Sequence, residues 1–435
     1  MSKKDKVLDG KCLYTPGGAA REYAAIGCNF YRGCPYQCKY CYNRKGLTAK
    51  VMGVDHAVLE DEFTKVKNRP KKYRHLSGEE YANTVFTREL DKNVEYLRNT
   101  GIFYSFSTDP MCPDACELTL STALYAISKG VPVRILTKNA SWTKEVFDRI
   151  ASFTAEQKRL IAFGFTLTGC DDWEPYASPN VERIELMRTL HDFGFKTFAS
   201  IEPVIDWEKS CQMIVRTIGF CDLYLIGTIS HFGDFYKSGS GTTFIANKCL
   251  RNIYSLQQLF NLKIYFKESI RKYIPETMTF LYGDGTETTV SPVPMDYDIF
   301  HEAMTDPLED IIHSLKYLNR HNAFLQGYEY KTEFQKESDI FLLWIFFMKY
   351  GNTSQLAEYV ESIDDSQKER VYNEFKTLLS NAKTFLDFLN MLGRDKKVMY
   401  ETDKGKANIL PWLIIYAEEL IEISNDVINE YQKIN

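Results

Sequence analysis

Three cysteines close together give the first indication of chemistry, in the segment Tyr31-Arg-Gly-Cys-Pro-Tyr-Gln-Cys-Lys-Tyr-Cys-Tyr42. Cys34, Cys38 and Cys41 form a C-x3-C-x2-C array. Cysteine thiolates hold iron–sulfur clusters, and four of them complete the ligand set of a [4Fe–4S] cube. Three thiolates from one loop leave the fourth iron with an open site, which a catalytic metal centre requires. The spacing therefore predicts a [4Fe–4S] cluster with these three cysteines as its ligands.

A structural zinc site is the alternative explanation of this array. Zinc normally takes four ligands arranged as two well-separated pairs. The sequence offers no matching second pair, because Cys28 lies upstream while Cys112 and Cys116 lie far along the chain. The array therefore favours a cluster over zinc.

The elements that must position the cysteines alternate between short β-rich runs and helical segments from about residue 20 to 230. The predicted strands are Tyr23–Phe30, Ile102–Ser107, Val131–Leu136, Ile161–Leu167, Lys196–Ile201 and Leu223–Gly227. The predicted helices are Glu80–Arg98, Leu118–Lys129, Lys144–Phe153, Val181–Phe193 and Lys209–Gly219. Strands separated by helices indicate βαβ units and a parallel sheet. Six units predict an α/β fold, a partial (β/α)6 TIM-like barrel, whose chemistry collects at the C-terminal ends of its strands.

The remaining sequence predicts an appended region and a second domain. Residues 262–290 suggest strands at Lys263–Lys267 and Thr286–Val290, and Ser291-Pro-Val-Pro294 is a natural break. The predicted domains are residues 1–290 and an all-helical C-terminal domain at residues 291–435. Its clearest helices are Asp310–Asn319, Phe341–Tyr350, Gln355–Ile363, Val371–Leu379 and Leu413–Tyr431.

The cysteine array resembles the signature of the radical S-adenosylmethionine (SAM) superfamily, C-x3-C-x-aromatic-C, with Tyr40 as the aromatic residue. The resemblance implies a barrel of the radical SAM type. It also implies that the open iron chelates the amino and carboxylate groups of SAM, and that an electron from the cluster splits SAM into methionine and a 5′-deoxyadenosyl radical. An electron donor of flavodoxin or ferredoxin type is implied as well.

Further segments are similar to one branch of this superfamily, the spore photoproduct lyase-like or DNA repair photolyase-like proteins. These segments are Tyr14–Tyr23, Asn29–Cys34, Leu136–Asn139 and Glu174–Arg183. Two runs, Ser200–Val204 and Tyr265–Glu268, are also similar to uncharacterised radical SAM proteins of phages. The resemblance covers roughly residues 12–270.

Roles for individual residues follow from this resemblance. It implies that Tyr40 packs against the adenine of SAM and that Lys138 meets the SAM carboxylate. It assigns the methionine amine or the ribose to residues at the end of the second strand, Ser107, Thr108 and Asp109. The other implied cofactor-binding residues are Thr166, Thr168, Arg183 and Glu202.

A catalytic thiol is a separate question, because Phe106 occupies the position where spore photoproduct lyases carry a hydrogen-donating cysteine. Cys112 and Cys116 lie just beyond it and are predicted as catalytic candidates, together with Tyr42. The alternative is that both cysteines are small packed residues at the start of a helix.

The run Lys65–His75 places six cations around one tyrosine, a composition that can contact phosphates. It favours nucleic acid, bound through Lys65–Arg74, as the substrate of a radical SAM enzyme performing repair or modification. The alternatives are a radical SAM enzyme acting on a peptide or small metabolite, and a non-enzymatic metal-binding module. The chain begins without a signal-peptide pattern and has no apolar run long enough for a membrane span, so a cytoplasmic location is predicted. The sequence leaves the oligomeric state open.

Overall fold

The computed structural model describes residues 7–45, 49–229, 240–271, 278–281, 287–290 and 299–300, together with separate positions between 313 and 429. The chain divides into two compact units made of interleaved segments. The first unit contains residues 1–249, 263–274 and 294–302, and the second contains the remainder. The first unit holds the cysteine array and the whole sheet described next.

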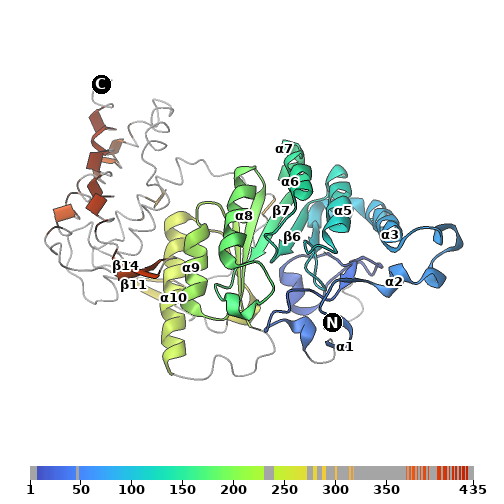
Figure 1. The fold of residues 1–435 in the computed structure, drawn as a ribbon. Helices are drawn as coiled ribbons and strands as arrows, with labels where there is room; N and C mark the ends of the chain where they lie inside the picture. Colours follow the sequence, from blue (N-terminus) through green and yellow to red (C-terminus); the bar gives the residue numbers. More distant parts are fainter. Residues whose placement is uncertain are drawn as a thin grey trace. The chain divides into compact units, whose positions relative to one another are not determined.

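An eight-stranded sheet organises the first unit, in the order β1-β2-β5-β6-β7-β8-β9-β10 (Figure 1). The strands are β1 (Leu13–Tyr14), β2 (Gly27–Cys28), β5 (Ile102–Tyr104), β6 (Val133–Thr137), β7 (Ile161–Thr166), β8 (Lys196–Val204), β9 (Leu223–Thr228) and β10 (Ile264–Phe266). β1 pairs antiparallel with β2, and every other pairing is parallel. The mixed α/β architecture with a mostly parallel sheet is therefore confirmed. One detail was wrong: the segment predicted as an appended strand is β10, the seventh parallel strand of the main sheet.

The connecting helices match the predicted ones closely. They are α3 (Gly78–Lys92), α4 (Val94–Thr100), α5 (Cys116–Ser128), α6 (Lys144–Ala151), α7 (Ala155–Arg159), α8 (Asn180–Asp192) and α9 (Trp207–Thr217). Figure 1 shows α5, α6 and α8 beside strands β6 and β7. The single helix predicted at Glu80–Arg98 is divided at Asn93, whose backbone (φ −121°, ψ 16°) leaves the helical region. A capping box between Ser77 and Glu80 fixes the start of α3.

Shorter elements complete the first unit. They are η2 (Gly18–Glu22), β3 (Tyr31–Arg32), η3 (Tyr42–Arg44), α1 (Ala49–Met52), β4 (Val58–Leu59), α2 (Asp61–Thr64), η5 (Val66–Asn68), η6 (Lys71–Tyr73), η7 (Asp171–Trp173) and α11 (Glu268–Arg271). The long helix α10 (Ser240–Phe260) crosses from the first unit into the second.

Contacts between distant strands show that the sheet is curved. Tyr23 lies just before β2, and its hydroxyl oxygen is 2.8 Å from Ser200 Oγ on β8. Its neighbour Glu22 accepts a hydrogen bond of 2.6 Å from the backbone N–H of Glu268, just after β10. These contacts require the chain before β2 to approach the opposite end of the sheet. Within the described residues β1 and β10 do not pair, and the barrel geometry itself stays a prediction.

The inner face of the curved sheet is tightly packed. It includes Phe103, Phe198 and Leu225, with Tyr23 and Phe106 packed against them. A Cβ atom at Gly164 would lie 2.1 Å from the Phe198 ring, so only glycine leaves room for that ring. The packed face forms the floor beneath the site.

The second unit includes β-structure as well as helix. β11 (Met278–Leu281) pairs with β12 (Glu287–Val290), in agreement with the strand predicted at Thr286–Val290. β13 (Met399–Thr402) pairs with β14 (Gly405–Asn408) as an antiparallel hairpin. The prediction of an all-helical C-terminal domain is wrong in this respect, because polar hairpin strands lack the apolar periodicity by which helices were recognised. The helices predicted at Phe341–Tyr350 and Gln355–Ile363 lie outside the described residues.

Among the described helices, none has the length and apolar character that a membrane span requires.

Candidate functional site

A cavity of about 480 Å³ opens at the C-terminal ends of the parallel strands. This volume falls within the range of roughly 300–1,000 Å³ typical of small-molecule sites. Six parallel strands contribute a lining residue at or just after their C-terminal ends: Ser105, Lys138, Thr166, Glu202, Thr228 and Lys267. The cavity therefore lies at the strand ends, where the sequence predicts that the chemistry collects.

All three cysteines of the array line this cavity, and their thiols are free. Gly33 turns the chain into the loop with φ +79°, and a Cβ atom there would lie 2.4 Å from the His56 carbonyl oxygen. The backbone N–H of Lys39 donates to the Trp173 carbonyl oxygen at 2.9 Å, which ties the loop to the segment after β7. The loop is thus held over the cavity by backbone contacts.

Burial dominates the electrostatics of the thiols. It raises the pKa of Cys34 to about 12 and that of Cys38 to about 11, and the nearby Lys138 ammonium opposes both shifts. A bound cationic centre would favour the thiolates, which are the metal-binding form.

The described residues contain no group of three or more His, Cys, Asp or Glu side chains placed to hold one metal ion. A tetrahedral zinc ion about 2.3 Å from each sulfur would need its sulfurs to converge closely. A cube instead binds each thiolate through a different iron, so its ligands surround a larger volume. Three thiols that line one cavity are the kind of ligand that a [4Fe–4S] cluster takes. The cluster itself stays a prediction.

Three residues of the cavity lining carry a buried polar atom without a hydrogen-bond partner among the described residues: Tyr36 Oη, Asn43 Oδ1 and Thr108 Oγ1. A buried polar group without a partner costs about 1–3 kcal/mol. The cavity lining therefore carries unpaired polar groups, although each of these atoms is itself closed to solvent. Among them, Thr108 was predicted as a cofactor ligand.

Lys138 directly follows β6 and lines the same cavity. Its Nζ makes no hydrogen bond or ion pair with the described residues, and it lies 5.7 Å from the centre of the Tyr40 ring. Burial lowers the pKa of Lys138, but Cys38, Glu174 and Asp109 outweigh burial and the net shift is upward. The ammonium therefore stays charged, with no anion of the described chain bound to it.

Asp109 also lines the cavity, but its carboxylate is fully used within the protein. Oδ1 accepts hydrogen bonds from Thr137 Oγ1 at 2.6 Å and from the Met111 N–H at 3.0 Å. Oδ2 accepts from the backbone N–H of Lys138 at 2.7 Å. Asp109 therefore positions the chain that carries Lys138, and its predicted contact with the cofactor stays a prediction.

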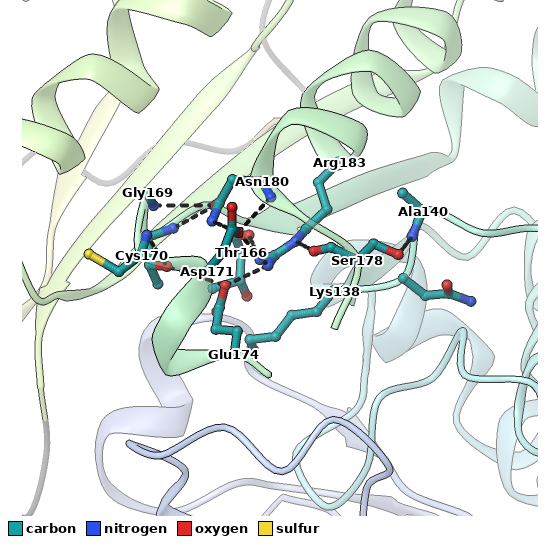
Figure 2. Close-up of polar contacts among 12 residues, drawn as sticks. Lys138, Ala140, Thr166, Gly169, Cys170, Asp171, Glu174, Ser178, Asn180 and Arg183 are labelled. Atoms are coloured by element: carbon teal, nitrogen blue, oxygen red, sulfur yellow. Dashed lines mark hydrogen bonds and ion pairs between the residues drawn. The ribbon is translucent and has the colours of Figure 1, made fainter. Parts of the chain in front are cut away.

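A buried network around Glu174 and Arg183 (Figure 2) holds the hydroxyl of Tyr40. The Tyr40 hydroxyl donates to Glu174, and Arg183 Nη2 donates to the other Glu174 oxygen at 2.5 Å. Arg183 also donates to the carbonyl oxygens of Thr166 and Ser178, at 2.5 and 2.6 Å. Figure 2 shows Lys138 extended toward Glu174 from the opposite side. Glu174 is hydrogen-bonded to Arg183 and Tyr40 and makes no ion pair with Lys138, although it still stabilises the lysine charge at longer range.

Three predicted cofactor ligands, Ser107, Thr168 and Arg183, do not line the cavity. Ser107 Oγ donates to the Tyr31 carbonyl oxygen at 2.5 Å, and Thr168 Oγ1 donates to Glu174 at 3.2 Å. Each side chain points into the protein and holds a neighbouring segment. The sequence correctly placed Ser107 and Thr168 just after strand ends but could not show which way they face, and Arg183 lies within α8, not at a strand end.

The predicted catalytic cysteines are not at the cavity either. Cys112 is fully buried outside it, and Cys116 Sγ lies 3.6 Å from the Pro113 carbonyl oxygen at the start of α5. In this structure a catalytic thiol at either position has no geometric basis, because neither sulfur reaches the lining. Tyr42 does line the cavity and donates its hydroxyl to the Phe106 carbonyl oxygen.

Glu202, also predicted as a cofactor ligand, forms a second polar group on β8. Its Oε2 accepts hydrogen bonds from Lys267 Nζ at 2.6 Å and from the Tyr23 hydroxyl. Lys267 is only 2% exposed, and its Nζ lies 4.2 Å from the centre of the Tyr23 ring. Burial, reinforced by Glu202, holds the pKa of Tyr23 well above its usual range, so the phenol remains a donor.

Sequence reasoning missed Glu174, Tyr23 and Lys267 as site residues. All three lie in segments that carried the family resemblance, which was the available signal. Most of their partners are remote in the chain, as with Tyr23 and Glu202, which are 179 positions apart, so no local pattern identified them.

The basic run lies outside this cavity, and one of its members is not available for binding. Arg69 is 4% exposed and donates to the carbonyl oxygens of Phe63, Thr64, Leu76 and Ser77. It was predicted to contact phosphate, but its guanidinium instead binds backbone carbonyl groups of its own loop. The exposed cations of the run are Lys65, Lys67, Lys71, Lys72 and Arg74.

Comparison with known proteins adds limited information. No model of a protein family matches the chain. The uncharacterised protein MJ0683 of Methanocaldococcus jannaschii is 27% identical over 213 residues, which are 48% of this chain and 67% of that protein. A crystal structure of Streptococcus suis SuiB bound to S-adenosylmethionine shares 10% identity with a TM-score of 0.34, over 57% of this chain. The match spans about half of SuiB (53%), and a similarity of this size does not establish a common fold.

Proposed function

We propose that this protein is a radical SAM enzyme, in which Cys34, Cys38 and Cys41 hold a [4Fe–4S] cluster and the adjoining cavity binds SAM. One observation carries the proposal. The three cysteines of a C-x3-C-x2-C array line a cavity at the C-terminal ends of parallel strands, beside a lysine that makes no ion pair with the described residues. When bound, the cluster would supply the electron that cleaves SAM.

The protein's own residues would bind and orient SAM. Lys138 offers a charged donor for the SAM carboxylate, and charge-assisted hydrogen bonds are among the strongest available. Tyr40 offers an aromatic ring, which its hydrogen bond to Glu174 fixes in place. Phe103, Phe106 and Leu136 supply an apolar wall that excludes water.

The proposal is tested by reconstituting the full chain with iron and sulfide under anaerobic conditions. It should then be brown and contain about four irons per chain. With dithionite and SAM it should release 5′-deoxyadenosine.

Cys38→Ala should abolish both iron binding and SAM cleavage. Cys116→Ala is the matched control, because this cysteine lies outside the cavity and should be dispensable. Stoichiometric zinc without iron uptake would instead favour a metal-binding module.

Nucleic acid is the substrate class that the exposed cations of the basic run favour, because clustered Lys and Arg side chains attract phosphates. Lys67, Lys71, Lys72 and Arg74 are exposed on the η5–η6 segment. A flavodoxin- or ferredoxin-type protein would supply the electron. Reduction of the reconstituted cluster by a flavodoxin, followed optically, tests that partner.

A further inference from the structure

The carboxylate of Glu202 has one oxygen committed to the protein and one directed to the ligand space. Oε2 accepts from Lys267 Nζ and from Tyr23, whereas Oε1 accepts nothing from the described residues. Gly227 provides the space for this carboxylate, because a Cβ atom there would lie 2.8 Å from Oε1. Glu202 therefore presents a fixed hydrogen-bond acceptor to the cavity.

The wall that adjoins this acceptor is aromatic. Phe106 stacks on Phe103 with 4.6 Å between ring centres, and Tyr23 meets Phe106 edge to face at 6.3 Å. All three residues line the cavity. A planar ring packs well against such a wall, and aromatic side chains commonly stack on unpaired nucleobases.

The charges of the lining argue against a cationic ligand group at this end. Arg44, Lys138 and Lys267 contribute positive charges, against the carboxylates of Asp109 and Glu202. A second cation beside Lys267 would be repelled. The geometry thus fits a neutral, planar group that donates a hydrogen bond.

We propose that the Glu202 end of the cavity is a substrate subsite for a nucleobase with an exocyclic amino group, namely adenine, cytosine or guanine. The amino group donates to Glu202 Oε1 while the ring packs against Phe106. This inference rests on the proposed function, since it specifies the substrate class of the same cavity.

The test uses the full chain, reconstituted and saturated with SAM but without reductant, so that no turnover occurs. Binding of cytidine, uridine, adenosine and inosine is measured by saturation-transfer NMR. Cytidine and adenosine should bind at least about tenfold more tightly than their keto analogues uridine and inosine, whose carbonyl oxygen would face Oε1.

Glu202→Gln should invert this preference. Lys267 and Tyr23 both donate to Oε2, so they would hold the carbonyl oxygen of the new amide and turn its NH2 group toward the cavity. The cavity would then present a donor, which favours uridine and inosine. Glu22→Gln is the matched control, because Glu22 lies 3.8 Å from Lys267 Nζ but outside this cavity, and the preference should not change.

Should Glu202→Gln fail to fold, Glu202→Asp serves as the second variant. Its side chain is one methylene shorter, so the carboxylate lies farther from the ligand, and cytidine binding should weaken about tenfold while the preference for amino over keto nucleosides is not inverted. Equal binding of amino and keto nucleosides, or no nucleoside binding, would overturn the proposal. Loss of nucleoside binding when SAM is added would assign the subsite to the adenine of SAM, and binding of arginine amide in place of nucleosides would assign it to a peptide. Either outcome refutes the proposal.

Iron content and SAM cleavage are measured on the same samples. A protein that prefers cytidine but takes up no iron would overturn the proposed function alone. A protein that cleaves SAM without the amino preference would overturn the subsite alone.

Discussion

Replacing Lys138 with methionine separates a ligand-binding cation from a structural one. Methionine preserves most of the side-chain length and removes the charge. Lys138 makes no ion pair with the described residues, whereas the buried cation Arg183 lies 2.5 Å from Glu174. Removal of the Lys138 charge should therefore weaken SAM binding, whereas removal of the Arg183 charge should destabilise the fold.

The expected loss of SAM affinity follows from the hydrogen bond that the methionine variant cannot make. If the ammonium binds the SAM carboxylate, the lost charge-assisted hydrogen bond is worth about 1.5–3 kcal/mol, or roughly 10- to 150-fold in affinity. The free energy of unfolding should change by less than about 1 kcal/mol, because Glu174 and Asp109 offset the desolvation cost of the ammonium without forming an ion pair with it.

Equilibrium dialysis with labelled SAM measures the affinity, and iron analysis and urea denaturation are run on the same preparation. Lys144→Met, at an exposed lysine of α6, is the control. Unchanged SAM affinity with normal iron content would refute the assignment of Lys138 to the carboxylate. Reduced iron content would show instead that Lys138 stabilises the cysteine thiolates.

Three further perturbations test other parts of the argument. Arg183→Met should lower the free energy of unfolding by about 3–5 kcal/mol in urea denaturation, because it leaves Glu174 buried without its counter-charge; a loss below about 1 kcal/mol would contradict this. Gly164→Ala should destabilise by about 1–3 kcal/mol or more, since its methyl group collides with a packed ring, while Gly219→Ala, with nothing within 4 Å, should be nearly neutral. Oligonucleotide affinity should fall less steeply with salt in a triple alanine variant of the basic run. The slope of log affinity against log salt concentration should be smaller by up to about three units. No binding by the wild type at low salt would remove nucleic acid as the substrate class. The triple variant replaces Lys71, Lys72 and Arg74.

The sequence by itself determined the order of strands and helices. Apolar runs of strand length, separated by amphipathic helices, require a parallel sheet whatever their detailed packing. The cysteine spacing likewise identified the loop that meets the cavity. Both are local properties, because a few consecutive residues carry each signal.

Placement at strand ends was also predictable, and it located Lys138, Thr166 and Glu202 at the cavity. Which neighbours face the cavity was not predictable for Ser107 and Thr168. Side-chain direction near a strand end depends on where the strand stops and how the loop turns, and a shift of one residue reverses it.

Only the tertiary structure decided which charges are compensated. Glu174 and Arg183 neutralise each other below Tyr40, and Lys267 reaches Glu202 from another strand, whereas Lys138 has no such partner. The energy of a buried charge depends on the groups around it and on its separation from water, and folding sets both. A sequence names the charged residues, but only their distances in the folded chain show which of them remain for a ligand.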